Sequence, residues 1–114
     1  MYRLVIADDD EIQLKGMCCA FPWEELGIEI VDVCHSGDDA WDSIQEKEPD
    51  IILTDIRMPV YDGLQIINKV NEKYGMSRNI CFIIISGYAE FEYARQAIQY
   101  NIVNYLLKPL DKNS

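Results

Sequence analysis

The chain has 114 residues, of which 49% are hydrophobic and 26% are charged, and its formal net charge is −10. This length and composition predict one globular domain with a single core. Because phosphate backbones repel so much negative charge, we expect this segment not to bind nucleic acid by itself. No apolar run approaches the ~20 residues that span a bilayer, which predicts a cytoplasmic protein without membrane contact.

The four cysteines do not form a pattern typical of a disulfide framework or a zinc site. Cys18 and Cys19 are adjacent, whereas Cys34 and Cys81 fall in apolar runs, and no pair has C-x-x-C spacing. We therefore expect reduced, buried thiols, without a metal or redox role.

Short apolar runs alternate with segments of helical period along the chain. The apolar runs predict strands near residues 2–8, 28–34, 50–55, 80–86 and 103–107. Four helices between them are predicted from apolar residues at helical spacing: Leu14, Met17, Cys18 and Phe21; Ala40 and Ile44; Leu64, Ile67, Val70 and Tyr74; and Phe91, Ala94, Ala97 and Ile98. This alternation is typical of βαβ units around a parallel sheet, so the predicted class is α/β.

Several residues indicate where the helices begin and end. Pro22 prevents an easy continuation of the first helix, and Pro49 ends the second. Ser36 with Asp39 three positions later predicts a capping box at the start of the second helix. The alternation calls for a fifth helix after the last strand, and the few residues after Leu110 are too short for one. We therefore expect an N-terminal fragment of a longer polypeptide, or an apolar groove that another chain covers.

Four of the apolar runs end at polar residues that carry a carboxylate, a hydroxyl or an amine. They end at Asp8-Asp9, at Asp55, at Ser86 and at Lys108-Pro109. In an open parallel sheet the carboxyl ends of the strands lie along one edge, where such folds bind their ligands. We therefore expect these acids, the hydroxyl and the amine to converge.

Three converging carboxylates repel one another and require a cation. Carboxylates suit a hard ion such as Mg²⁺, which keeps other positions for water or phosphate oxygens. The Lys108 amine and the Ser86 hydroxyl could then stabilise a phosphoryl group during its transfer. Asp55 is a candidate nucleophile, because a carboxylate can attack phosphorus to give an acyl phosphate.

With these residues in this order, the chain as far as Leu110 resembles the receiver domain of two-component response regulators. The resemblance implies a doubly wound, flavodoxin-like sheet of five parallel strands in the order 2-1-3-4-5, with its fifth helix truncated here. It implies that Asp55 is the phospho-acceptor and that Asp9 binds Mg²⁺ directly. Asp8 would reach the metal through water or orient the site, and the backbone carbonyl of Arg57 would be the third metal contact.

The same resemblance assigns a conformational switch. Ser86 matches the switch hydroxyl of the family and Tyr105 its switch aromatic. The Lys108-Pro109 bond matches a cis peptide that aims the amine at Asp55. A histidine kinase would donate the phosphoryl, and the receiver would be a signalling domain that promotes its own phosphorylation and dephosphorylation, not an enzyme.

Two further segments, residues 21–27 and 86–94, resemble receivers that precede an AraC-type helix-turn-helix domain. This narrower resemblance implies a transcription regulator in which residues 1–114 form the receiver and DNA binding belongs to an output domain that is absent here. It also implies a receiver homodimer on activation.

Other readings remain open. A stand-alone phosphorelay or adaptor receiver would share every site residue. A haloacid-dehalogenase-type phosphatase also forms an aspartyl phosphate, but it requires a second Asp two residues after the nucleophile, where Arg57 stands. A flavodoxin-like binder of a nucleotide or flavin would use the same edge of the sheet, yet glycine-rich phosphate loops are absent from the sequence.

Overall fold

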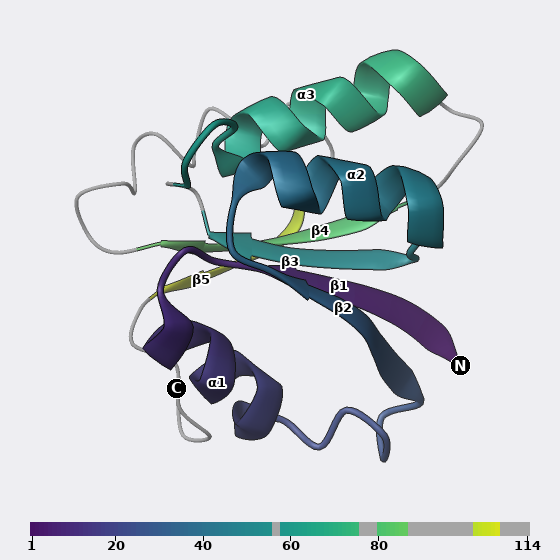
Figure 1. Ribbon diagram of the computed structural model, residues 1–114. Coiled ribbons are helices and arrows are strands. Elements are labelled where there is room, and N and C mark those ends of the chain that lie inside the picture. Colours follow the sequence, from purple (N-terminus) through teal and green to yellow (C-terminus); the bar gives the residue numbers. More distant parts are fainter. Residues whose placement is uncertain (56–57, 76–79, 87–101, 108–114) are drawn as a thin grey trace.

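The computed structural model describes residues 1–55, 58–75, 80–86 and 102–107 (Figure 1). Its elements, in chain order, are β1 (Tyr2–Ala7), α1 (Glu11–Ala20), β2 (Ile28–Cys34), α2 (Gly37–Lys47), β3 (Ile51–Asp55), α3 (Gly63–Tyr74), β4 (Cys81–Ser86) and β5 (Ile102–Leu107). The helix predicted around residues 91–98 lies outside the described residues.

The strands form one parallel sheet in the order β2-β1-β3-β4-β5. The predicted α/β class with a parallel, doubly wound sheet is therefore confirmed. The register pairs Ala7 of β1 with Thr54 of β3, and Asp55 with Ile85 of β4. The carboxyl ends of the central strands consequently lie side by side, as a site at that edge requires.

The helices cover both faces of this sheet, with α2 and α3 on one face and α1 on the other (Figure 1). Neighbouring strand residues point to opposite faces: Ile52 packs in the cluster on the α2 and α3 side, whereas Leu53 packs in the cluster on the α1 side. Burial on both faces explains why the central strands β1, β3 and β4 contain nearly continuous apolar runs.

The start of α1 and its end follow from local chemistry. The Asp10 carboxylate accepts hydrogen bonds from the backbone N–H groups of Ile12 and Gln13, so it caps the helix. The helix ends at Ala20, and Phe21 has an extended backbone. The prediction that Phe21 lies on the inner face of the helix was therefore wrong by one residue, because Pro22 stops the helical path before it.

The other two helices have different caps. The Ser36 hydroxyl accepts the N–H of Asp39 at 3.4 Å, which confirms Ser36 as the N-cap of α2. The predicted capping box is only half formed, because the Asp39 side chain does not accept the N–H of Ser36. A reciprocal capping box is present at α3, where Asp62 and Gln65 each accept the backbone N–H of the other. Sequence reasoning missed this box, although an Asp three residues before a Gln is its usual signature.

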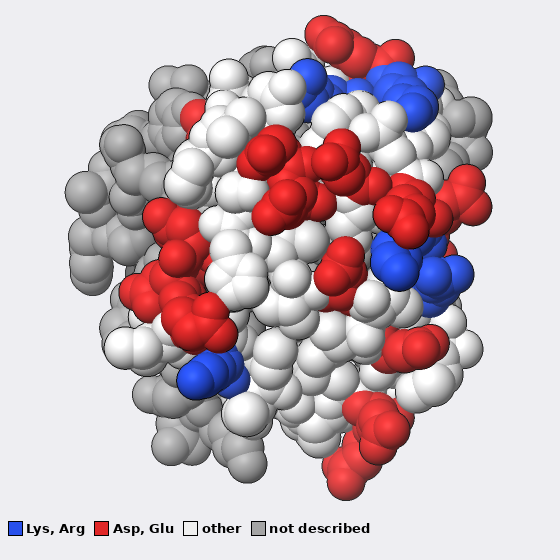
Figure 2. Space-filling model, viewed as in Figure 1, with Lys and Arg blue, Asp and Glu red and all other residues white. Residues whose placement is uncertain are grey.

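Acidic side chains spread over the face seen in Figure 2, and Lys and Arg side chains are fewer. None of the helices in the described ranges is long and apolar enough to span a bilayer.

The thiols differ more than expected. Cys34 is buried and Cys19 is exposed, while Cys18 and Cys81 are partly buried. All four are free, so no disulfide joins them. Burial, together with the nearby negative charge of Asp32, raises the pKa of the Cys34 thiol to about 12.

Candidate metal and phosphoryl-acceptor site

Three aspartates meet at the carboxyl edge of the sheet. Carboxylate oxygens of Asp8, Asp9 and Asp55 all lie within 4.8 Å of one another. Asp8 is fully buried and Asp55 is only 5% exposed, whereas Asp9 faces solvent. Two acids are thus held in the protein interior, and the third closes the cluster from the solvent side.

Backbone hydrogen bonds hold the first two acids at the end of β1. The N–H of Asp8 donates to the carbonyl of Cys34 at 3.0 Å, which extends the pairing of β1 with β2 by one residue. Oδ1 of Asp8 accepts the N–H of Asp10 at 2.9 Å. This contact turns the chain out of the strand and toward α1, and it places Asp9 beside the buried carboxylate.

Asp55 is the last residue of β3. It pairs with Ile85 of β4, and Thr54 before it pairs with Ala7 of β1. The Thr54 hydroxyl is buried, donates to the carbonyl of Asp55 at 3.0 Å and lies 3.8 Å from Sδ of Met58. These contacts tie the strand end to the loop that follows. They therefore hold the backbone that carries the Asp55 carboxylate.

The loop after Asp55 packs against the start of α2. The N–H of Gly37 donates to the carbonyl of Pro59 at 2.9 Å. A Cβ at Gly37 would lie only 1.9 Å from the carbonyl oxygen of Tyr61. Sequence reasoning did not single out this glycine, because only the tertiary structure shows which backbone approaches it.

The same loop contains Val60, whose φ of +70° is unusual for a β-branched residue. Val60 is 65% exposed, so packing of its side chain does not account for this conformation. The backbone path between β3 and α3 sets it instead, since Pro59 and Tyr61 are both held against Gly37.

The donor set fits a hard divalent cation. Three carboxylates within 4.8 Å repel one another unless positive charge lies between them. Oxygen-only ligands suit Mg²⁺ and do not suit the softer ions that prefer thiolate or imidazole. His35, which is exposed, pairs with Glu11 at 2.7 Å, and so it does not extend this donor set.

Of the remaining predicted site residues, the structure describes only the backbones of Ser86 and Tyr105. The backbone of Ser86 ends β4 opposite Leu107, and Tyr105 lies opposite Ile84. Their side chains are outside the described part of the structure, as are Arg57 and Lys108 altogether. The structure thus brings together Asp8, Asp9 and Asp55, and it places the backbone of Ser86 one strand away from Asp55.

The fold and the acid cluster define a class of protein, and comparison of the sequence with known families identifies that class. The family model described as "Response regulator receiver domain" matches residues 4–114. The chain therefore belongs to the receiver-domain family of two-component response regulators. Receiver domains are signalling domains, and they generally bind Mg²⁺ through acidic residues.

Among curated proteins, the chain is similar to the "Uncharacterized transcriptional regulatory protein YesN" of Bacillus subtilis (strain 168). The two are 41% identical over 112 residues, which are 98% of this chain and 30% of YesN. It is also 34% identical to the transcriptional regulatory protein HptR of Staphylococcus aureus (strain NCTC 8325 / PS 47), over 97% of this chain and 42% of HptR. The chain thus spans less than half the length of these relatives.

Solved structures of response regulators are also similar to this chain. The receiver domain of AraT, a response regulator from Geobacillus stearothermophilus, superposes with a TM-score of 0.89 at 33% identity, covering 98% of this chain and 84% of that one. A two-component transcriptional regulator AraC from Clostridium phytofermentans ISDg gives a TM-score of 0.85 at 28% identity, over 99% of this chain and 85% of that one. The relatives thus include AraC-type transcription regulators.

Proposed function

We propose that Asp55 accepts a phosphoryl group from the phosphohistidine of a sensor kinase. An Oδ atom of Asp55 forms a bond to phosphorus while the bond between phosphorus and the histidine nitrogen breaks, and the imidazole leaves with the electron pair. The observation that carries this proposal is the cluster of Asp8, Asp9 and Asp55, with Asp55 buried at a strand end.

Asp9, Asp55 and the backbone carbonyl of Arg57 would hold Mg²⁺ directly, and Asp8 would reach the metal through water or orient the site. When bound, the metal neutralises the acids and the charge that develops on the phosphoryl oxygens. The chain's own contribution is position, because Asp8 and Asp55 are buried and their backbones are fixed by neighbouring strands. A nucleophile held in place needs less reorganisation during the reaction.

Three further residues complete the proposal, on the basis of their positions in the sequence. Lys108 pairs with a phosphoryl oxygen, and the Ser86 hydroxyl donates a hydrogen bond to the same group. Tyr105 then turns into the space that Ser86 leaves. The modification thereby shifts a population that already exists in the unmodified chain.

The output is proposed from the relatives. Because curated relatives are transcriptional regulators and are more than twice as long, we infer that the complete protein carries an AraC-type DNA-binding domain after this receiver. A fifth helix after β5 would complete the fold, and phosphorylation would favour a receiver homodimer in the cytoplasm. The sequence downstream of residue 114 distinguishes this reading from a stand-alone relay receiver.

The direct test is intact-mass analysis after incubation with a small-molecule phosphodonor, with and without Mg²⁺. We expect the mass of one phosphoryl group to be added only when Mg²⁺ is present. Asp55→Asn should abolish the gain, and Asp9→Asn should make it require much more Mg²⁺.

Asp42→Asn is the matched control, because it removes the same charge from an exposed position on α2. It should be phosphorylated like the wild type. A phosphoryl group that persists in Asp55→Asn, or that forms equally without metal, would contradict the proposed site.

A further inference from the structure

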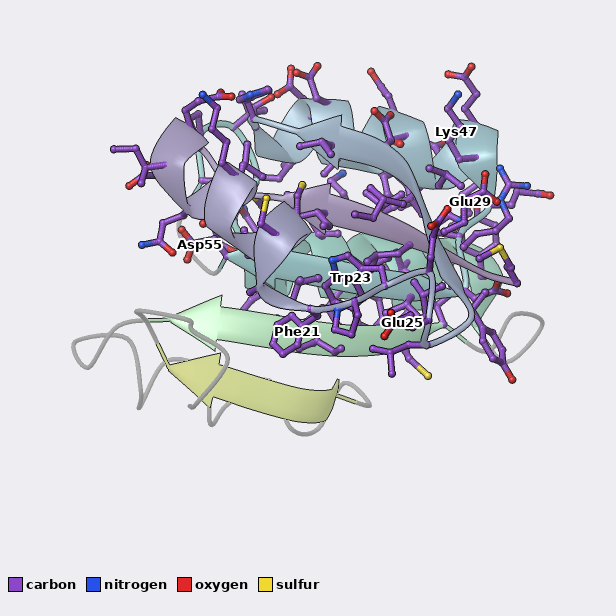
Figure 3. All side chains as sticks on the ribbon, turned by 90° about the horizontal axis from the view of Figure 1, so that it is seen from below. Phe21, Trp23, Glu25, Glu29, Lys47 and Asp55 are labelled. Carbon is purple, nitrogen blue, oxygen red and sulfur yellow. The ribbon has the colours of Figure 1, made fainter. Side chains whose placement is uncertain are left out.

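A second site candidate lies at the opposite end of the sheet from Asp55. A groove of about 680 Å³ is lined by Met1, by Cys18 of α1, by the segment between α1 and β2, and by the start of β2. Figure 3 shows Phe21, Trp23 and Glu25 following one another away from the Asp55 end of the sheet, with Glu29 beyond them. Nothing in the phosphorylation chemistry uses these residues.

Aromatic side chains form the apolar part of the groove. The rings of Phe21 and Trp23 are 5.2 Å apart and tilted by 55°. Both rings are only partly buried, and Met1, which is 72% exposed, also lines the groove. Aromatic rings that stay accessible to solvent are typical anchors for a binding partner, because each offers a large apolar area at a small entropic cost.

The segment that carries the rings is rigid before anything binds. Nε1 of Trp23 donates to the carbonyl of Met17 at 3.1 Å, and the carbonyl of Trp23 accepts the N–H of Ile28 at 2.9 Å. Gly27 closes the turn with a φ of +77°, and its carbonyl accepts the N–H of Tyr2 at 2.9 Å. A preformed surface loses less conformational entropy on binding than a mobile one, which favours tighter binding.

The charges around the groove select the occupant. Three exposed glutamates line it, Glu24, Glu25 and Glu29. No Lys or Arg in the described part of the chain lies within ion-pair distance of them. This rim repels nucleic acid, anionic lipid and a second copy of a chain whose net charge is −10, and it attracts Lys and Arg.

We propose that this groove docks a basic, amphipathic segment of another protein, with apolar side chains of the segment on Phe21 and Trp23 and its Lys or Arg side chains on Glu24, Glu25 and Glu29. Both halves of the site are needed: the rings supply contact area, and the acids select the sign of the charge. The docking is independent of phosphorylation at Asp55, which lies at the other end of the sheet.

The test uses Trp23 as its own probe. Trp41→Phe removes the only other tryptophan of the chain, so the remaining emission reports on the groove. The ligand is a peptide of about 14 residues with leucine and lysine at amphipathic helical spacing. We expect a saturable change in Trp23 emission, with an affinity that falls as salt is added.

Two double substitutions that make the same change of charge distinguish binding in the groove from attraction by the overall negative charge of the protein. Glu25→Lys with Glu29→Lys should weaken binding at least about tenfold, or 1.4 kcal/mol. Asp42→Lys with Glu46→Lys makes the same charge change on exposed positions of α2, and it should weaken binding less than about twofold. Equal weakening by both pairs would overturn the proposal, because diffuse charge would then explain the binding.

Variant peptides test whether the rings of Phe21 and Trp23 contribute to binding. A peptide in which serine replaces every leucine keeps its charge and should bind at least about tenfold more weakly. A peptide in which glutamate replaces every lysine should not bind. Equal binding of the serine peptide would overturn the role of Phe21 and Trp23. A change in emission with protein concentration in the absence of peptide would show that a second copy occupies the groove, and it would also overturn the proposal.

Discussion

The two ends of the sheet present functional groups in different ways. At the carboxyl end, Asp8 and Asp55 are buried. Asp8 directly follows β1 and Asp55 ends the neighbouring β3, so the register of the sheet sets the distance between them. At the amino end, Phe21 and Trp23 belong to a connecting segment that is held by its own hydrogen bonds and by the packing of Trp23 against the core on the α1 side. The geometry of the first end is set by sheet register, whereas that of the second end is set mainly by a connecting turn.

The largest expected effect separates the two ends by stability. Leu53 is 1% exposed and packs between the sheet and α1, so Leu53→Ala should lower the free energy of unfolding by about 2–5 kcal/mol. Leu26, in the turn beside the groove, is 56% exposed, and Leu26→Ala should cost less than about 0.5 kcal/mol. Urea unfolding followed by circular dichroism measures both values. Similar losses in the two variants would contradict the comparison.

The next effect concerns the contact between the loop after Asp55 and α2. Gly37→Ala places a Cβ against the backbone of Tyr61, so it should destabilise the fold by about 1–3 kcal/mol and slow phosphorylation of Asp55. Gly16→Ala is the matched control on α1, where nothing lies within 4 Å of the added Cβ. It should stabilise the protein by up to about 1 kcal/mol.

Both variants can be followed by thermal unfolding and by the rate of mass gain with a phosphodonor. A Gly37→Ala protein as stable as the wild type would show that the loop can move away from α2 at no cost. The proposed rigidity of the site end would then be wrong.

Alkaline pH should also lower the stability of the fold, through Cys34 at the carboxyl end of β2. Burial raises the pKa of Cys34 from its ordinary value of 9.0 to about 12, so the folded state favours the neutral thiol. The contribution of this group to stability is fully present below pH 9 and is lost as the pH rises toward 12. At pH 10 the loss should be about 1 kcal/mol.

The measurement is urea unfolding at pH 7, 9 and 10. Cys34→Ala should be less stable at every pH but should lose less on going from pH 9 to pH 10. An unchanged pH dependence in that variant would assign the alkaline loss to other groups. Cys19 is exposed, so Cys19→Ala should leave the pH dependence as it is.

The smallest effect concerns backbone strain. Glycine adopts the φ of +70° at Val60 without steric cost, so Val60→Gly should gain about 0.5–1 kcal/mol in the folded state, partly offset by the more flexible unfolded chain. Val60→Ala retains a Cβ at the same φ and serves as the control. Thermal unfolding would show the difference, and a less stable glycine variant would exclude strain at this position.

Local patterns of the sequence predicted much of this structure. The apolar runs predicted the observed strands to within a residue or two, and Ser36 caps α2 as expected. The buried faces agree as well, since Leu14, Met17 and Ile44 are all in the core. The end of α1 was less predictable, because Phe21 has the apolar character of a helix face although the chain leaves the helix before it.

The sequence by itself determined the order of strands and helices, their caps, and the three acids at strand ends, because these depend on local spacing and on the alternation of apolar and polar residues. The distances between those acids, the close approach of Tyr61 to Gly37, and the acidic groove around Trp23 were decided only in the tertiary structure. The acid cluster and the contact between Gly37 and Tyr61 join residues far apart in the chain, whereas the groove is built mainly from residues 18–30 and is completed by Met1. Their separation is set by sheet register and by packing against a shared core, which no local pattern encodes.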